Sequence, residues 1–149
     1  MALIRLKKIL VAVIALSLTG CTYTHVYRFA EVEPSVFDAE VPIDTFFAAN
    51  GFVEIDLDSP PYSDLLAEYV KREGVTRIWE KWYKGSLSEF SGGIRATEEI
   101  KDGLPVIVIN NWSRESETEE IASSLTNWFR ISYPRLSVQY TKNSELNLK

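Results

Sequence analysis

Cysteine and histidine are nearly missing from this chain. Its 149 residues include one cysteine, Cys21, and one histidine, His25. A single thiol cannot form an intramolecular disulfide. A zinc site needs several Cys or His ligands, so no metal site of that kind is predicted. A catalytic triad needs a base that the fold positions, and His25 lies in an N-terminal segment that we expect to be solvated, so no catalytic set is predicted.

An excess of positive charge is also missing. The sequence holds 16 Lys and Arg against 21 Asp and Glu, a net charge of −5 at neutral pH. Nucleic acids and anionic lipid surfaces are bound by faces rich in lysine and arginine. The composition therefore predicts no nucleic-acid partner. The pair Gly92-Gly93 lacks the pattern of a phosphate-binding loop and indicates a turn or bulge, so no cofactor is predicted either.

No apolar run in the chain is long enough to cross a bilayer. Ile9–Leu18 is apolar except for Ser17, which falls well short of the ~20 residues that a membrane-spanning helix needs. Three bases, Arg5, Lys7 and Lys8, precede this run, and the first twenty residues contain no acid. A basic start, a short apolar middle and small residues at the end are typical of a secretory signal peptide.

The end of this segment, Leu18-Thr19-Gly20-Cys21, resembles the lipobox of bacterial lipoproteins. The resemblance covers only the residues up to Cys21. It implies cleavage after Gly20, a diacylglyceryl group on the Cys21 sulfur, and acylation of the new amino group. Each buried methylene contributes ~0.8 kcal/mol, so two or more chains would hold the protein durably on a lipid bilayer. Thr22, in place of Asp, resembles the sorting pattern for the outer membrane in a bacterium with two membranes.

The remaining 129 of the 149 residues are enough for one domain with a core. They carry a net charge of −8, because the first twenty residues hold three of the bases and none of the acids. No Gly/Ser-rich tether follows Cys21. We divide the chain into a signal peptide at 1–20, a lipidated N-terminus and connecting segment at 21–50, an α+β domain at 51–141, and a polar tail at 142–149.

Hydrophobic periodicity and turn residues predict the elements of the domain. Strands are expected at 52–57, 94–100, 106–109 and 136–140, a short helix at 42–49, and main helices from Ser59 to Gly74 and from Ser116 to Tyr133. A loop is expected at 31–44. Ser116 and Glu119 have the spacing of a capping box. Lys101-Asp102-Gly103 predicts a hairpin turn.

Val75–Lys84 fits two structures. Its apolar residues recur at helical spacing, whereas its β-branched and aromatic composition favours a strand. We prefer the strand. The fold is then an α+β sandwich, with a mostly antiparallel sheet of four to five strands and two main helices on one face. If the stretch is helical, the order becomes ferredoxin-like.

Asp and Glu carboxylates are the remaining candidates for catalytic groups in this sequence. Neighbours in a strand point to opposite faces, so Glu98 and Glu99 cannot act together on one substrate. Glu98 shares a face with Ala96 and Ile100, and an acid on an apolar face has a raised pKa, as general acids do. A structural salt bridge explains Glu98 as well, and we prefer that interpretation. The acids at 54, 56 and 58 lack the spacing and the glycine of an EF-hand.

Aromatic residues are the most suggestive feature. Trp79, Trp82, Tyr83 and Trp112 are candidate contacts, because exposed Trp and Tyr rings stack on sugars or anchor protein interfaces. Trp128 lies on an apolar helix face and is expected in the core. In a strand, Trp79 and Tyr83 share one face while Trp82 lies on the other, so one face is left away from the core.

Three functions are consistent with the sequence. The first is a non-enzymatic envelope lipoprotein that binds an envelope protein or peptidoglycan. The second is a carboxylate-dependent hydrolase of the envelope with Glu98 as its acid. The third is a structural lipoprotein without a ligand. The absence of a catalytic set favours the first, in which Cys21 is the lipid attachment site.

Overall fold

The computed structural model describes residues 22–58, 67–83 and 92–145. These residues form an α+β fold, as the sequence predicted. The strands are β1 (Thr22–Ala30), β2 (Val53–Glu54), β3 (Val75–Trp82), β4 (Gly93–Lys101), β5 (Leu104–Trp112) and β6 (Ser137–Glu145). The helices are α2 (Pro34–Glu40), α3 (Ile43–Ala49), α5 (Ala67–Glu73) and α6 (Glu115–Ser132).

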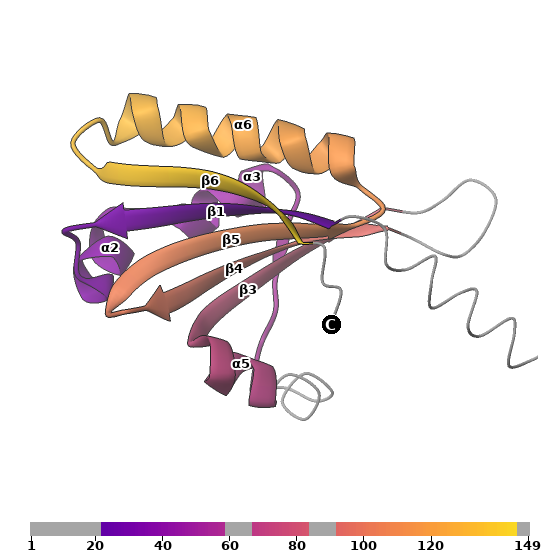
Figure 1. Cartoon of the computed structure of the whole chain (residues 1–149), viewed down its shortest axis with the longest axis horizontal. Coiled ribbons are helices and arrows are strands. Elements are labelled where there is room, and N and C mark those ends of the chain that lie inside the picture. Colours follow the sequence, from indigo (N-terminus) through magenta and orange to yellow (C-terminus); the bar gives the residue numbers. More distant parts are fainter. Residues whose placement is uncertain (1–21, 59–66, 84–91, 146–149) are drawn as a thin grey trace, which may run out of the picture.

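The described strands form one six-stranded sheet in the order β2-β3-β4-β5-β1-β6, and every neighbouring pair is antiparallel (Figure 1). The sheet has six strands, one more than the upper number of the four to five expected. The additional strand is β1, which lies between β5 and β6. Its side chains alternate, and Tyr27 and Phe29 are fully buried on the same face.

The N-terminal part of the folded unit therefore begins before residue 51. Residues 21–50 were expected to connect the anchor to the domain, but they supply β1, α2 and α3. Pro34 opens α2 inside the predicted loop 31–44, because proline suits the first turn of a helix. At the other end, Thr22 lies opposite Glu145, so residues 142–145 of the predicted tail belong to β6. Residues 146–149 lie outside the described residues.

Val75–Lys84 contains a strand, as we preferred. β3 pairs with β4 on one side and with the two-residue β2 on the other. The ferredoxin-like alternative needed a helix at this position and is wrong. The hairpin between β4 and β5 turns at Asp102 and Gly103, both with positive φ, as the Asp-Gly signature predicted.

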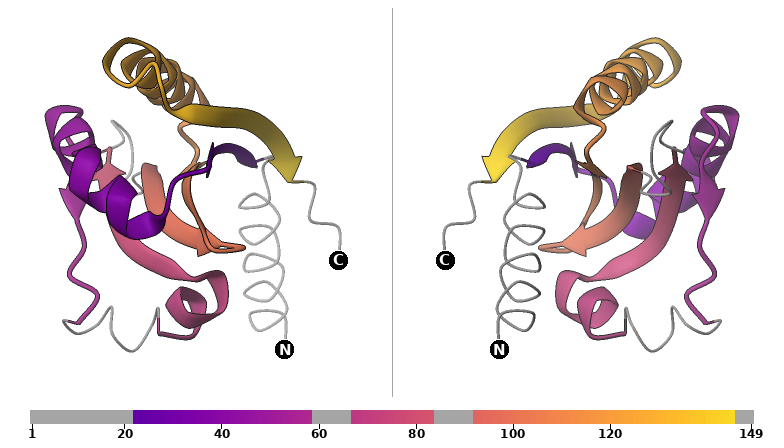
Figure 2. Two further views of the ribbon diagram at one scale, coloured as in Figure 1. Left: turned by 90° about the vertical axis from the view of Figure 1, so that its left-hand side faces the viewer. Right: turned by 90° about the vertical axis from the view of Figure 1, so that its right-hand side faces the viewer.

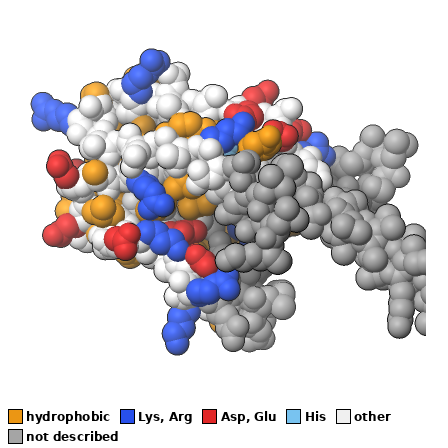
Figure 3. Space-filling model, viewed as in Figure 1, with side chains coloured by type: hydrophobic (Ala, Val, Ile, Leu, Met, Phe, Trp, Pro, Cys, Tyr) orange, Lys and Arg blue, Asp and Glu red, His pale blue; other side chains and the backbone are white. Residues whose placement is uncertain are grey.

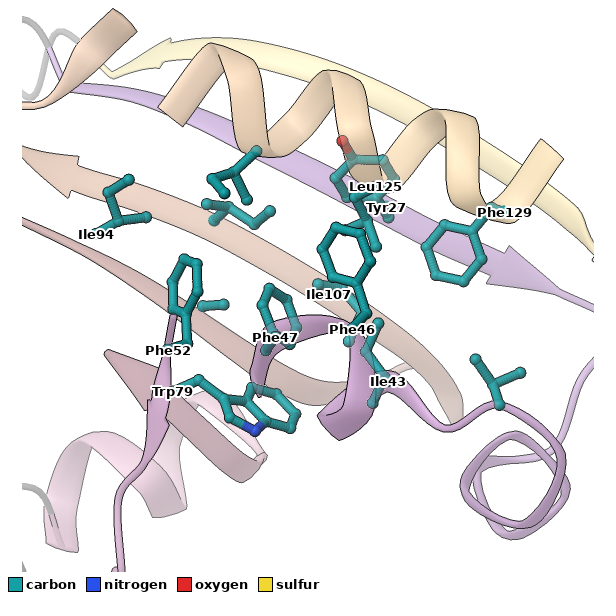
Figure 4. Packing of buried hydrophobic residues seen from close by; sticks show 14 of the residues in the cluster. Tyr27, Ile43, Phe46, Phe47, Phe52, Trp79, Ile94, Ile107, Leu125 and Phe129 are labelled. Carbon is teal, nitrogen blue, oxygen red and sulfur yellow. The ribbon is translucent and has the colours of Figure 1, made fainter. Parts of the chain in front are cut away.

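The helices α2, α3 and α6 cover one face of the curved sheet, and α5 lies on the other side (Figure 2). The expectation of both main helices on one face is therefore wrong for α5. Phe46 and Phe47 of α3 reach the same cluster as Leu125 and Phe129 of α6 (Figure 4). Burial of each such side chain contributes ~1.5–3 kcal/mol. The Tyr27 hydroxyl donates to the Ala122 carbonyl at 2.7 Å and fixes β1 to α6.

The boundaries of α6 were predicted correctly at one end only. The helix ends before Tyr133, as expected from Tyr133-Pro134. Its start is not a capping box, because Ser116 lies inside the helix and Arg114 occupies the cap position without a side-chain cap bond. The Asn111 side chain accepts a hydrogen bond from the Arg114 amide at 3.2 Å instead. The predicted cap of the preceding helix, Ser59, lies outside the described residues.

Candidate binding surface

The face of the sheet opposite α6, called the polar face below, carries a second set of ordered side chains. Alternation along the strands separates it from the core face. Its members include Thr24, Val26 and Arg28 of β1, Ile78, Glu80 and Trp82 of β3, Arg95, Thr97 and Glu99 of β4, Val106, Val108, Asn110 and Trp112 of β5, and Gln139, Thr141 and Asn143 of β6.

Two tryptophans meet at one end of the polar face. Trp82 of β3 and Trp112 of β5 are both opposite Gly93 of β4, which lies between them. Their rings stack almost parallel, with centroids 5.6 Å apart and an interplanar angle of 4°. Stacking across a whole strand requires that the middle residue have no side chain. A Cβ on Gly93 would lie 3.1 Å from Trp82 and 3.3 Å from Trp112.

A buried ion pair lies beside the Trp82–Trp112 pair. Arg95 donates two hydrogen bonds to Glu80, at 2.6 and 2.9 Å, and Glu80 is only 2% exposed. The other carboxylate oxygen of Glu80 accepts a bond from the Trp82 indole nitrogen at 3.0 Å. The Arg95 guanidinium also lies over the Trp112 ring, 4.9 Å from its centroid. These contacts hold the two indoles in place, while Trp82 remains 58% exposed.

A groove of about 450 Å³, called the polar groove below, runs over the polar face beyond the ion pair. Val26 and Val108, opposite each other, line its middle. Thr24, Asn110 and Asn143 line the end next to the ion pair, because Asn110 lies opposite Arg95. Arg28 lies further along β1. Among the described residues, these polar side chains have no hydrogen-bond partner of their own. Amide, hydroxyl and guanidinium groups are therefore left to bind a polar ligand.

The far end of the polar groove is closed by paired charges. Lys101 binds Glu73 of α5 at 2.9 Å and approaches Glu99 to 3.4 Å. The hydrogen bond from Lys101 lowers the pKa of Glu73, and the same bond raises the pKa of Lys101. The Glu99 carboxylate accepts a further bond from Thr97 at 2.9 Å. These charges neutralise one another and leave the groove without a strong net sign.

Glu98 points to the opposite, helix-covered face. Burial, followed by the neighbouring Asp38 carboxyl, raises its pKa to about 7, while Arg77 opposes the shift. Arg77 binds Glu98 at 2.6 Å and Asp38 at 3.4 Å. Glu98 lines neither the polar groove nor the cavities beside α6 and beside β2. The geometry supports the interpretation of Glu98 as a structural ion pair.

The four aromatic candidates are separated by the fold. Trp79 is only 1% exposed and stacks on Phe47 at 4.8 Å, so it is a core residue and is removed from the candidate contacts. Tyr83 packs against the same core, under the guanidinium of Arg114 at 4.7 Å. Only Trp82 and Trp112 share a surface. Trp128 packs at the edge of the core, as expected.

Sequence reasoning missed the polar residues of this surface. Gly93 was interpreted as a turn or bulge, and the relation between Glu80 and Arg95 has no local signal because 15 residues separate them. His25 was expected to be solvated, but it is fully buried in β1, with Nδ1 2.8 Å from the Tyr140 hydroxyl. Burial lowers its pKa, and Glu119 opposes the shift. The reason for the error is the position of β1 inside the sheet.

Comparison of the chain with protein-family models, curated proteins and solved structures found no match. Within residues 22–58, 67–83 and 92–145, no three His, Cys, Asp or Glu side chains lie together in a way that could hold a metal ion. No helix in the same part of the chain is long and apolar enough to span a membrane.

Proposed function

We propose that this chain is a lipid-anchored, non-enzymatic binding module of the bacterial cell envelope. The lipid is attached at Cys21, the end of the lipobox-like segment Leu18-Thr19-Gly20-Cys21. The ligand is a neutral, hydroxyl-rich polymer of the cell wall, a peptidoglycan glycan strand, which lies in the polar groove. Outer-membrane sorting is proposed for a source with two membranes, because Thr22 follows the cysteine.

The row of unpaired polar groups in the groove carries this proposal. Thr24 lies opposite Asn143, and Asn110 comes from the strand on the other side of β1. Sugar hydroxyls and acetamido groups both donate and accept hydrogen bonds, and so do these amide and hydroxyl groups. Arg28 adds donors but no acceptor. A neutral polar ligand satisfies such a row better than a strongly charged one.

The buried acids support binding rather than hydrolysis. Glu80, Glu98 and Glu99 are each engaged by at least one cation, Arg95, Arg77 or Lys101 respectively. A general acid must reach the bond that it protonates. None of these three carboxylates is free of protein partners, which does not favour the hydrolase alternative with Glu98 as its acid.

The first experiment is titration of the protein with soluble oligomers of the peptidoglycan glycan strand. We expect saturable binding that weakens at least about tenfold in Asn110→Ala combined with Asn143→Ala, since each lost hydrogen bond contributes about 0.5–1.5 kcal/mol. Asn127→Ala is the matched control, because Asn127 lies on α6 and its side chain bonds only Arg130 among the described residues. Binding that is equally strong in all variants would remove the groove from the proposal.

The anchor is tested separately by mass spectrometry of the protein purified from its native membrane. We expect a chain that starts at Cys21 with added acyl groups, and an unmodified mass in Cys21→Ala. A chain that is unmodified or cut elsewhere would contradict the lipoprotein assignment while leaving the groove testable by titration.

A further inference from the structure

The Trp82–Trp112 pair lies at the same end of the sheet as the proposed lipid attachment site. β1 begins where β5 ends (Figure 1). His25 lies opposite Ile109, and continuing this antiparallel register by three residues places Thr22 level with Trp112. Trp112 is level with Gly93 and Trp82. The start of β1 and the two indoles therefore mark one end of the molecule.

The covalent link to this end is as short as it can be. Cys21 directly precedes Thr22, and Thr22 is already paired with Glu145 in the sheet. Consecutive Cα atoms are about 3.8 Å apart. An acylated Cys21 would hold this end of the sheet at the bilayer surface, and groups there would meet lipid at a high effective concentration. A long tether between Cys21 and β1 would let the domain turn any side towards the bilayer.

The surface at this end has the chemistry of a membrane interface. Indole rings prefer the headgroup level, where the apolar ring and the polar nitrogen find different surroundings. Trp82 is exposed, and Val53, opposite Glu80 on the next strand, is the other large exposed apolar residue of this part of the sheet. The nearby charges of Glu80 and Arg95 are paired with each other. Away from this end, the face of the molecule in Figure 3 carries both acidic and basic side chains.

We infer that the Trp82–Trp112 pair contacts the lipid bilayer that holds Cys21, and that its indoles lie among the headgroups. The inference depends on the proposed lipid anchor but not on the glycan ligand. It predicts the orientation of the domain: the sheet stands on the membrane by the end that carries Thr22, Trp82 and Trp112, and the polar groove rises away from the surface.

The test uses the natively acylated protein in phosphatidylcholine vesicles whose acyl chains carry bromine, a quencher of tryptophan emission. The chain has four tryptophans. We expect quenching that is stronger with bromine near the headgroup than with bromine near the chain end. Trp82→Phe with Trp112→Phe should abolish most of this quenching. Trp128→Phe, which changes a tryptophan packed beside the core, should retain it.

Two controls separate the possible failures. Mass spectrometry of the same sample establishes acylation, and an unacylated protein would overturn both the anchor and this inference. If the protein is acylated and vesicle-bound but bromine does not quench it, while aqueous iodide quenches Trp82 fully, the pair faces water and the inference alone is overturned. Protection of Trp82 from iodide by the glycan oligomer would then identify the pair as part of the glycan site.

Discussion

The two faces of the sheet are ordered by different forces. On the helix-covered face, α2, α3 and α6 bury a continuous apolar cluster, and Arg77 and Glu98 beside it are bonded to each other. On the polar face, charge pairs and a ring stack hold the side chains in place, and Glu80 and Glu99 are nearly as buried as the core. Close packing of apolar side chains thus orders the helix-covered face. Ion pairs, and the space that Gly93 leaves for the two indoles, order the polar face.

The largest expected effect on the free energy of unfolding comes from a tryptophan of β3. This strand carries one tryptophan on each face, and each can be replaced by alanine. Trp79→Ala should destabilise the protein by about 3–5 kcal/mol, because it opens a cavity beside Phe47 in the core. Trp82→Ala removes a ring that is mostly exposed and should cost much less. Urea denaturation measures both free energies of unfolding. Equal losses would show that the polar face is packed as tightly as the core.

The ion pairs on the two faces can be compared by removing the arginine from each and measuring the free energy of unfolding. Arg95→Met leaves Glu80 buried without a cation, and we expect the free energy of unfolding to fall by about 3–5 kcal/mol. Arg77→Met leaves Glu98, whose pKa is already raised to about 7 by burial and by Asp38, and this carboxyl can take up a proton. Because Arg77 opposes the shift, its removal raises the pKa of Glu98 further. The variant therefore loses stability relative to the parent as pH rises through about 7, where the parent's Glu98 ionises beside Arg77.

The measurement for both arginine variants is urea denaturation at about pH 6 and about pH 8. The loss in Arg77→Met should be clearly greater at the higher pH. A loss in Arg77→Met that is the same at both pH values would contradict the raised pKa of Glu98.

A side chain at Gly93 should disturb only the polar face. Gly93→Val forces atoms against Trp82, Trp112 and the Lys81 carbonyl, all within 3.1–3.3 Å of a new Cβ. Overpacking of this kind costs about 1–3 kcal/mol. We expect iodide to quench the two indoles more strongly once they separate. Unchanged quenching together with unchanged stability would mean that the ring stack does not depend on the glycine.

The smallest expected effect is the pH dependence contributed by His25. Burial holds its pKa below the ordinary value of 6.5, so the unfolded state takes up the proton first and stability falls as pH drops below about 6.5. His25→Gln should show less loss between about pH 7.5 and pH 5.5. The opposite contribution of Glu98 is common to both proteins and cancels in the comparison. A variant as acid-sensitive as the parent would contradict the buried neutral His25.

Sequence reasoning was most reliable where the signal was local. The turn at Asp102-Gly103, the end of α6 before Tyr133 and the strand at β3 all follow from residues within one element. It failed where a partner was distant. Apolar alternation was present in β1, but its place in the sheet depends on residues 106–109 and 137–145. Ser116 and Glu119 had the spacing of a capping box, and Asn111 took the role instead.

The sequence by itself determined the α+β class, the hairpin of β4 and β5, and a lipobox-like segment ahead of the folded residues, because these depend on periodicity, turn chemistry and a contiguous motif. Only the tertiary structure decided that Trp79 is core while Trp82 meets Trp112, that His25 is buried, and that β1 lies between β5 and β6. The physical reason is that strand order and register are long-range contacts, and a residue's face has meaning only once its neighbouring strand and the covering helices are known.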